Sequence, residues 1–492
     1  MIKRILGTET EFGVAAKDPE TLDPVSNSIL LVNSYPNVPS PQALWDYENE
    51  NPLLDARGFE ADGERERPGP EYNRLLNKLL GNGGRLYVDG AHPEYSTPEC
   101  TNAHDLLAYE KAGERIMDLA REMASRIKRG DDRFSVYKNN SDGKGNSYGY
   151  HENYLVAREI PFDRLAAYLI PFLVTRQIYA GAGKVGAENK TEQVPYQISQ
   201  RADFFEVLVD LNTMVKRPLI NTRDEPHADP ARYRRLHVIV GDSNMAETST
   251  YLKVGVAALV LAMLEEGVDI DVELANPVQA NREISRDLTL KRPVKLSSGK
   301  GATAIEIQRI YLERAERHFS KAKSDPGIAD ILVRWRSVLE RLAQDPMQLS
   351  RELDWVIKRE LLESYMSKKG CGWADPRIAM MDLQYHDVRL DKGLYYALDR
   401  GGYVERVLDP EEVNRALETP PPDTRAYFRG MCIKKFPKEV YAASWTSVLF
   451  DAGNTSIKRI PLLEPLRGSR DLVGRLLDDS STVEELLANI AA

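Results

Sequence analysis

Strand and helix patterns are unevenly distributed along this chain, and their distribution limits the folds available to it. Runs that favour β-strands occur at 2–12, 85–89, 205–209 and 236–240. Helical patterns occur at 103–129, 249–266 and 301–367. The almost wholly apolar composition of the middle one predicts a buried helix. Because strands cluster first, without regular βαβ alternation and without a Gly-x-Gly-x-x-Gly turn, the pattern predicts an α+β fold and disfavours a dinucleotide-binding fold.

Proline-rich stretches indicate where the chain divides. The segment 419–423 contains three consecutive prolines, which end helices. We therefore expect a large domain over 1–418 and a small C-terminal domain over 425–492. The polar segment 56–72 can bury little apolar surface, and it is predicted to be a mobile loop. Residues 44–47, Leu-Trp-Asp-Tyr, are an unusual composition for an idle linker.

Composition argues against several classes of protein. The net charge of −9 is unlike that of a protein that wraps nucleic acid. The longest apolar run, 254–264, is too short to span a bilayer, and the N-terminus lacks the pattern of a secretory signal. Three widely separated cysteines, Cys100, Cys371 and Cys432, argue against a disulfide framework or a cysteine-based zinc site. We expect a cytoplasmic protein that binds neither membrane nor nucleic acid.

Two glutamates near the N-terminus share one strand face. In Gly-Thr-Glu-Thr-Glu-Phe-Gly, residues 7–13, Glu9 and Glu11 are two positions apart. Neighbouring carboxylates repel, so a positive group is expected beside them, and Mg²⁺ prefers such oxygen ligands. A solvated strand face would explain the pair equally well.

A second acidic motif, 87–99, follows an apolar strand. Asp89 ends that strand before a glycine, a suitable position for a base or a nucleophile. Glu94 and Glu99 could add metal ligands. A polar loop that caps the helix at 103–129 is the alternative, and spacing alone slightly favours it.

Basic side chains gather between residues 200 and 244. They are Arg201, Arg217, Arg223, Arg232, Arg234, Arg235 and His237. Arginine suits bidentate binding of carboxylate and phosphate, so this region predicts an anion site, although a salt-bridged surface has the same composition. Arg235 and His237 would share one strand face, as would His151 and Asn153. Because no Walker or kinase motif is present, a nucleotide would bind on a sheet through metal-linked phosphates.

Long motifs along the chain resemble those of the Pup ligase and Pup deamidase/depupylase family. They are GTETEFG at 7–13, YVDGAHPEYSTPE at 87–99, YKNNSDGKGNSYGYHENY at 137–154, QISQRAD at 197–203, INTRDEPHADPARYRRLHVIVGDSN at 220–244, RAYFRG at 425–430 and AASW at 442–445. The resemblance implies a glutamine-synthetase-like fold, in which helices pack a curved, mainly antiparallel sheet and a small C-terminal domain completes the nucleotide site.

The resemblance also implies an activity. One branch of the family couples Pup to substrate lysines with ATP. The other deamidates the C-terminal glutamine of Pup and hydrolyses the Pup–lysine isopeptide bond. Segment 45–59 resembles the extra loop of the second branch, which we place at about 45–78, and the opening GTE points the same way. ATP and Mg²⁺ are the implied cofactors, and Pup and pupylated proteins the implied partners.

Site roles are likewise implied by matching positions. The catalytic residue would be Asp89, and the metal neighbourhood would be Glu9, Tyr87, Glu94, His151 and His237. The nucleotide would contact Gly7, Thr8, Glu9, Thr10, Glu11, Ser96, Thr97, Asn153, Arg235 and Trp445. Arg201 and Arg223 would hold phosphate or the terminal glutamyl group of Pup. Asp89 could attack the carbonyl directly or activate water, and bound phosphate could take part.

Three other functions stay open at this point. The chain could be a Pup ligase of the same family, a small-molecule glutamate–amine ligase of the same fold, or a nucleotide-bound Pup-binding protein without catalysis. The 45–59 segment disfavours the first and the long Pup-family motifs the second. The complete set of Asp89, Glu9 and His151 disfavours the third.

Overall fold

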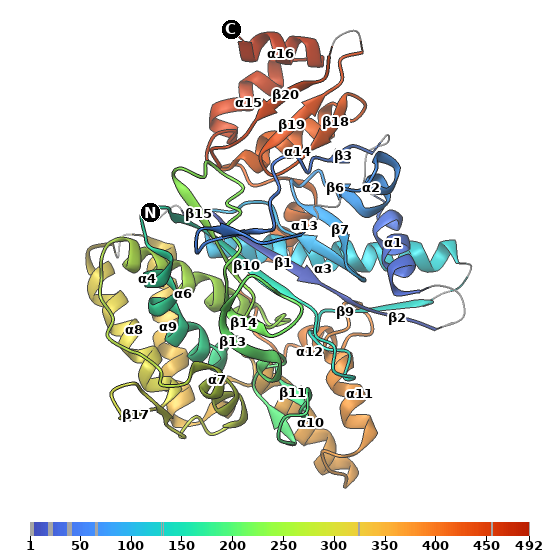
Figure 1. Cartoon of the computed structure of the whole chain (residues 1–492). Coiled ribbons are helices and arrows are strands. Elements are labelled where there is room, and N and C mark those ends of the chain that lie inside the picture. Colours follow the sequence, from blue (N-terminus) through green and yellow to red (C-terminus); the bar gives the residue numbers. More distant parts are fainter. Residues whose placement is uncertain are drawn as a thin grey trace.

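A sheet of antiparallel strands forms the centre of the computed structural model. The structure describes residues 4–17, 23–36, 42–63, 67–128, 130, 132–322, 325–453 and 456–491. Among these residues, six strands pair in the order β15-β10-β1-β8-β7-β6 (Figure 1). Their bounds are β1 Leu6–Glu11, β6 Asn77–Leu79, β7 Arg85–Asp89, β8 His92–Ser96, β10 Tyr150–Ala157 and β15 Tyr233–Val238. Each neighbouring pair is antiparallel, which confirms the predicted α+β, mainly antiparallel architecture.

The two faces of this sheet differ in burial. Side chains along β1 and β10 alternate between buried and half-buried, as the two-residue period of a strand requires. The buried face packs against helices α3 (Ala103–Ile127) and α6 (Glu247–Glu265). The opposite face carries Glu9 and the other polar residues of the candidate site. A single sheet therefore separates an apolar core from a polar site.

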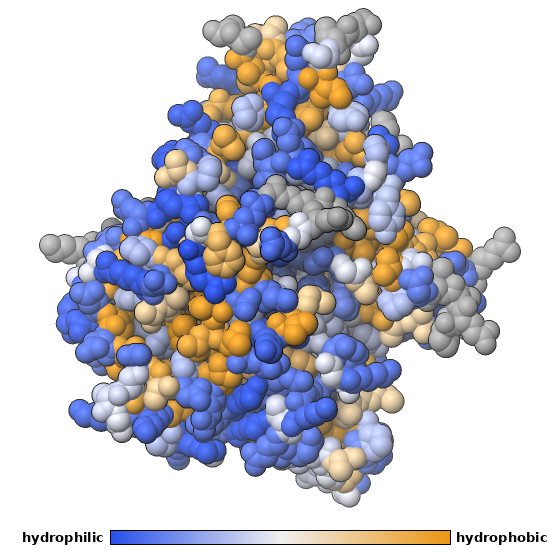
Figure 2. Space-filling model, viewed as in Figure 1, coloured by the Kyte–Doolittle hydropathy of each residue, from blue (hydrophilic) through white to orange (hydrophobic). Residues whose placement is uncertain are grey.

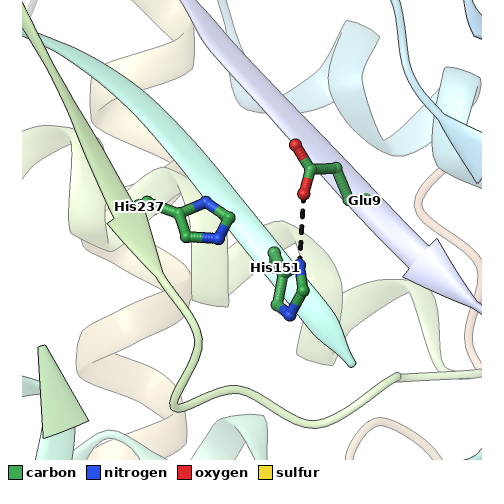
Figure 3. Close-up of side chains that lie close together, drawn as sticks. All are labelled: Glu9, His151 and His237. Carbon is green, nitrogen blue, oxygen red and sulfur yellow. Dashed lines mark hydrogen bonds and ion pairs between the residues drawn. The ribbon is translucent and has the colours of Figure 1, made fainter. Parts of the chain in front are cut away.

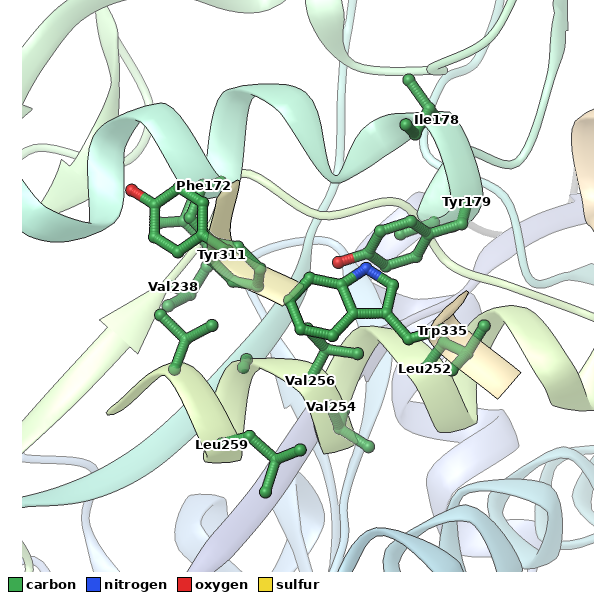
Figure 4. Packing of buried hydrophobic residues seen from close by; sticks show 14 of the residues in the cluster. Phe172, Ile178, Tyr179, Val238, Leu252, Val254, Val256, Leu259, Tyr311 and Trp335 are labelled. Carbon is green, nitrogen blue, oxygen red and sulfur yellow. The ribbon is translucent and has the colours of Figure 1, made fainter. Parts of the chain in front are cut away.

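Helix α6 is the centre of the largest apolar cluster (Figure 4). It is long and apolar enough to cross a membrane by length and composition alone, but 94% of that stretch is buried inside the protein. Trp335, Tyr179 and Tyr311 pack around its valines and leucines. The predictions of helices at 103–129 and 249–266 are confirmed.

Further helices extend this core. They are α4 Phe162–Thr175, α5 Gln177–Ala180, α7 Pro277–Arg286, α8 Ala304–His318, α9 Pro326–Gln344, α10 Asp354–Lys369, α11 Pro376–Tyr385, α12 Leu394–Arg400 and α13 Pro410–Glu418. Helix α1 (Pro24–Ser34) packs on α3 at the other end of the sheet. The helical pattern predicted over 301–367 is confirmed as α8, α9 and α10.

Short strands complete the large part of the chain. They are β2 Gly13–Ala16, β9 Phe134–Tyr137, β11 Lys184–Val185, β12 Tyr196–Gln197, β13 Phe205–Asp210, β14 Arg217–Asn221, β16 Val294–Lys295 and β17 Gly301–Ala302. The strand expected at 236–240 begins and ends earlier, as β15.

The C-terminal region has its own sheet and apolar cluster. Its elements are α14 Arg425–Lys435, β18 Val440–Ala443, β19 Ser447–Phe450, β20 Lys458–Pro461, α15 Arg470–Asp479 and α16 Val483–Ala491. Helix α13 ends at Glu418, so 419–424 is a break, as expected. Strand β3 (Leu44–Trp45) pairs in parallel with β18, and Trp45 is buried in the C-terminal cluster. The domain limits of 1–418 and 425–492 stay a prediction, but residues 44–45 belong to the C-terminal sheet.

Part of the segment predicted to be a loop at 56–72 has regular structure. Strand β4 (Leu54–Asp55) pairs with β5 (Phe59–Glu60), and α2 (Pro70–Leu76) begins within it. The backbone of Ala56 donates to Thr222 O at 2.7 Å, and Asp224 N donates to Leu54 O at 2.8 Å. The start of the segment is therefore docked against the chain before β15, and parts of the predicted mobile loop form regular structure. Residues 64–66 lie outside the described residues.

The outer surface in the view of Figure 2 is mainly hydrophilic, with hydrophobic side chains gathered in smaller groups. Phe59 in β5 is 48% exposed, so the docked segment buries little of its apolar surface. This agrees with the polar composition of residues 56–72. Its docking therefore depends on hydrogen bonds more than on apolar contact.

Candidate active site

Three adjacent strands bring a glutamate and two histidines together. Glu9 of β1, His151 of β10 and His237 of β15 point toward one another, and each offers a ligand atom within 4.8 Å of the others (Figure 3). The register explains this, because Glu9 pairs with His151, and His237 pairs with Asn153 on the next strand. His151 Nδ1 and Glu9 Oε2 are 3.1 Å apart. One carboxylate and two imidazoles form a donor set that suits a divalent metal ion.

The protonation states of this group favour metal binding. Burial raises the pKa of Glu9, but the hydrogen bond with His151 and the charges of His237, His151 and Arg235 together outweigh burial, and the pKa lies well below its ordinary value. Burial, followed by the charge of Arg235, lowers the pKa of His237 well below its ordinary value. Glu9 is therefore ionised and His237 neutral near neutral pH, as metal ligands must be.

Asn153 and Arg235 hold these ligands in place. Asn153 Nδ2 donates to Glu9 Oε1 at 3.0 Å, and Asn153 Oδ1 accepts from Arg235 Nη1 at 2.8 Å. His237 Nδ1 lies 2.9 Å from the same amide oxygen. If Nδ1 carries the proton, Nε2 of His237 presents its lone pair to a metal ion. The predicted pairing of side chains 151 with 153 and 235 with 237 is confirmed.

A second acidic group lies beside the first. Glu11, Asp89 and Glu94 come from β1, β7 and β8, and their carboxylate oxygens lie within 4.8 Å of one another. His92 Nδ1 is 3.4 Å from Glu11 Oε2, so each glutamate of β1 has a histidine neighbour. Burial and then the charge of Asp89 raise the pKa of Glu94 well above its ordinary value.

A cation fits this acidic group. Glu94 Oε2 is buried and has no hydrogen-bond partner among the residues that the structure describes. A buried carboxylate oxygen without a partner is costly, and a divalent cation bound by oxygen ligands would relieve that cost. The donor set, carboxylates with a neighbouring phenol at Tyr87, is one that suits Mg²⁺. Tyr87 pairs with Glu94 in the sheet, and burial raises its pKa, so the phenol stays neutral.

Asp89 is the most accessible member of the acidic group. It ends β7 and is exposed, whereas Glu94 is buried. Partial desolvation and then the charge of Glu11 raise the pKa of Asp89, while His151 and Arg223 lower it. An exposed carboxylate next to a cation-binding group can reach a substrate that binds from solvent.

A pocket lies beside Glu9, against strands β1, β8, β10 and β15. Its empty volume, part of which is open to solvent, is about 530 Å³. Of the residues expected at the nucleotide, the following line it: Gly7, Thr8, Glu9, Ser96, Thr97, Asn153, Arg235 and Trp445. Backbone amides, hydroxyls, a guanidinium and an indole together suit a nucleotide.

Two of the residues expected at the nucleotide lie elsewhere. Thr10 is 1% exposed on the opposite face of β1, so its side chain faces away from the pocket. Glu11 belongs to the acidic group with Asp89. Strand alternation explains the position of Thr10, whereas Glu11 shares the face of Glu9 but lies farther along β1, at the acidic group.

The two arginines expected at substrate or phosphate have different surroundings. Arg201 is 2% exposed, and its guanidinium donates to the carbonyls of Ile239 and Gly241. Burial lowers its pKa to about 10, so it remains a cation near neutral pH. Arg223 is half-buried, and its Nε is buried without a hydrogen-bond partner among the described residues. Arg223 is thus the freer of the two to bind an anion near Asp89.

Among the pocket residues that were not predicted at the nucleotide, three have acidic or basic side chains. Glu99, His227 and Arg425 line the pocket. Glu99 is not a metal ligand, because its carboxylate accepts hydrogen bonds from Arg425 and Arg429 of α14. The RAYFRG motif held both arginines, but nothing in the sequence linked them to Glu99.

Comparison with known proteins identifies the family. The model of the Pup-ligase protein family matches residues 4–449. The chain belongs to the Pup-ligase family. A depupylase of Acidothermus cellulolyticus is 49% identical over 496 residues, covering 99% of this chain and 98% of the relative. A Pup deamidase/depupylase of Mycolicibacterium smegmatis is 47% identical, covering 99% of this chain and 100% of the relative.

Solved structures of this family share the fold. The Pup ligase PafA in complex with Pup has a TM-score of 0.80 and 34% identity, covering 99% of this chain and 94% of that one. PafA in complex with ADP has a TM-score of 0.74 and 38% identity, covering 82% of this chain and 90% of that one. The predictions of the family and the fold are confirmed.

Proposed function

We propose that this member of the Pup-ligase family is a Pup deamidase/depupylase. It converts the C-terminal glutamine of Pup to glutamate and hydrolyses the isopeptide bond between Pup and substrate lysines. ATP and Mg²⁺ are bound cofactors, and ATP is not consumed in each turnover, since hydrolysis needs no net energy input. We also propose a cytoplasmic location, where Cys100, Cys371 and Cys432, free in the structure, would stay reduced.

The observation that carries the proposal is full-length similarity to depupylases. The relatives named depupylase or Pup deamidase/depupylase cover 99% of this chain. A Pup–protein ligase of Actinosynnema mirum is 51% identical, but over only 73% of this chain. The segment expected to mark the depupylase branch, 45–59, is docked beside Arg223 through the hydrogen bonds of Ala56 and Asp224.

Asp89 is the group proposed to begin the reaction. An amide carbonyl is a poor electrophile, so the site must supply a strong base or nucleophile and stabilise the oxyanion. Asp89 either attacks the side-chain carbonyl and displaces ammonia or the lysine amine, giving an anhydride that water then hydrolyses, or takes a proton from water that attacks the carbonyl and displaces the same amine. The positive charge of Arg223 favours the ionised form of Asp89 and can stabilise the developing oxyanion.

The neighbouring residues hold the cofactors. Glu9, His151 and His237, together with Glu94 and the phenol of Tyr87, would bind the cation, and Arg235, Ser96 and Thr97 would contact the nucleotide. When bound, Mg²⁺ supplies Lewis-acid polarisation of oxygen. Trp445 would contact the adenine. Arg201 would add positive charge near Glu11, which favours an anionic group such as the carboxylate of Pup or a phosphate.

A matched pair of variants tests the catalytic role. Asp89→Asn removes the charge but keeps the size of the side chain, and Asp269→Asn changes an exposed aspartate elsewhere, whose side chain is 93% exposed. We expect Asp89→Asn to bind labelled Pup as the wild type does, measured by fluorescence anisotropy, and to lose deamidation and depupylation. Asp269→Asn should keep both.

The same experiment separates the alternatives. Full hydrolysis by Asp89→Asn would refute the role of Asp89. ATP-driven conjugation of Pup ending in glutamate, without hydrolysis, would identify a ligase. Pup binding without either reaction in the wild type would identify a non-catalytic Pup-binding protein.

A further inference from the structure

We propose that His227 binds the nucleoside part of the nucleotide, its base or ribose, and so contributes to the selectivity of the pocket. His227 lines the pocket together with Trp445 and Arg425. It lies in the chain between β14 and β15, which Figure 1 shows reaching toward the C-terminal region. This inference rests on the proposed function, because it requires a nucleotide in this pocket.

The backbone at His227 is unusual. Its φ of 47° lies in the left-handed region, which residues other than glycine rarely adopt. Such a conformation is unfavourable for a residue with a side chain and persists only where the surroundings hold it. Strain of this kind often occurs at ligand-binding positions, so the conformation of His227 is consistent with a ligand contact.

Neighbouring hydrogen bonds hold this conformation. Asp224 N donates to Leu54 O at 2.8 Å, and the carboxylate of Glu225 accepts from Asn51 N at 2.6 Å. On the other side, Arg235 Nε donates to the backbone carbonyl of Glu225 at 2.7 Å. The docked 45–60 segment and the central sheet thus fix the residues directly before His227, and the ring is placed in the pocket.

The state of the ring suits a neutral ligand group. Burial lowers the pKa of His227 to about 4, so the imidazole is neutral near neutral pH. Glu225 Oε2 is 3.8 Å from Nε2, which is longer than a hydrogen bond. A neutral imidazole has one donor and one acceptor nitrogen, and this pair matches the edge of a base or a ribose hydroxyl. Phosphates would instead favour a cation such as Arg235.

The surroundings agree with this assignment. Pro226, Trp445 and Pro465 also line the pocket, and they offer apolar surface for a base. Arg235 and Glu9 lie toward the metal-binding histidine His237, with 3.7 Å between Arg235 Nη1 and Glu9 Oε1. The pocket therefore offers charged groups that suit phosphates and apolar surface that suits a base, and His227 directly follows Pro226 of that apolar surface in the chain.

Two substitutions separate recognition from backbone strain. His227→Gly removes the ring at a position where glycine is relaxed, so the chain should fold as before. His227→Asn also tolerates this backbone and keeps a donor and an acceptor. His318→Asn, which changes a histidine paired with Glu266 on the surface, is the control. Thermal unfolding of all four proteins verifies that they fold.

Competition against a fluorescent ATP analogue gives the readout. The competitors are ATP, GTP, 2′-deoxy-ATP and inorganic tripolyphosphate, each with Mg²⁺. We expect His227→Gly to bind ATP about tenfold more weakly, an effect of about 1.4 kcal/mol, with tripolyphosphate unchanged. His227→Asn should recover part of the loss. If His227→Gly loses less affinity for GTP than for ATP, the ring contacts the base. If it loses less affinity for 2′-deoxy-ATP than for ATP, the ring contacts the ribose.

Two results would overturn the inference and leave the proposed function intact. One is unchanged ATP affinity in both variants, and the other is an equal loss for ATP and tripolyphosphate. If the wild type does not bind ATP, the inference fails together with the nucleotide part of the proposed function. Pup hydrolysis by the wild type, measured separately, distinguishes these cases.

Discussion

Replacement of Glu99 by glutamine should destabilise the protein strongly. Glu99 follows β8, and its Oε1 accepts from Arg425 Nε at 2.7 Å and from Arg429 Nη1 at 3.1 Å. All three residues are at most 8% exposed. The ion triad therefore joins the central sheet to α14 of the C-terminal region at the wall of the nucleotide pocket. Glu99→Gln would leave two buried guanidinium groups without their counter-charge.

The pKa of Glu99 gives the magnitude. Burial raises the pKa of Glu99, but the charges and hydrogen bonds of Arg429 and Arg425 together lower it by more, so that the pKa falls from 4.5 to about 2. One pKa unit corresponds to about 1.4 kcal/mol, so the ionised form contributes about 3 kcal/mol to the free energy of unfolding. Removal of one partner from a buried ion pair costs a similar amount, about 3–5 kcal/mol. We therefore expect Glu99→Gln to lose about 3 kcal/mol near neutral pH.

The sign of the pH dependence follows from the lowered pKa. A lowered carboxylate pKa stabilises the folded state above the unfolded value, near pH 4.5, and this stability is lost as the pH falls toward about 2. The wild type and Glu99→Gln should thus differ most near neutral pH. Their difference should shrink as the pH falls through this window.

Urea unfolding of the nucleotide-free proteins, followed by tryptophan fluorescence, measures the effect. The control is Glu464→Gln, which breaks the more exposed pair with Arg232 between the same two parts of the chain. Exposed pairs contribute about 0–1 kcal/mol, so the control should change little. If Glu99→Gln lost no more stability than Glu464→Gln, or if its deficit grew at low pH, the reasoning would be wrong.

Three further predictions follow from the site and the core. Glu94→Gln should weaken Mg²⁺ binding at least about tenfold, since it alters a buried oxygen that has no hydrogen-bond partner in the described part of the chain; titration calorimetry with Mg²⁺ alone measures this, and unchanged affinity would contradict it. Trp335→Ala should cost about 3–5 kcal/mol of unfolding free energy, because the side chain is fully buried (Figure 4); urea unfolding tests it, and a loss below about 1 kcal/mol would count against the packing. Affinity for acidic Pup should fall as salt rises if Arg217 and Arg223 attract it; anisotropy that is independent of salt would refute a charged groove.

Local patterns in the sequence predicted the elements that local physics determines. The apolar periodicity of α3 and the almost wholly apolar composition of α6 placed both helices, and the two-residue period of β1 and β10 assigned the strand faces correctly. The pairing of Glu9 with Glu11 and of His151 with Asn153 followed from that period alone. Glu152 lies between His151 and Asn153 in β10, so the two-residue period places it on the buried face of the sheet. There it accepts a hydrogen bond from Arg176.

Contacts between distant parts of the chain could not be predicted in this way. The ion pairs of Glu99 join residues more than 300 positions apart, and β3 pairs with a strand near the C-terminus. The docking of residues 54–56 on 222–224 depends on backbone hydrogen bonds that leave no pattern in side chains. The position of His227 depends on its left-handed backbone, which composition does not reveal.

The most direct test of the account is mass spectrometry of two substrates incubated with the protein and Mg-ATP. One is Pup ending in glutamine, and the other is a pupylated protein. The account predicts the mass change of an amide converted to a carboxylate on Pup, release of the free target protein, and no ADP formed in proportion to product. Unchanged substrates, together with ATP-driven conjugation of Pup ending in glutamate, would contradict it and identify a ligase.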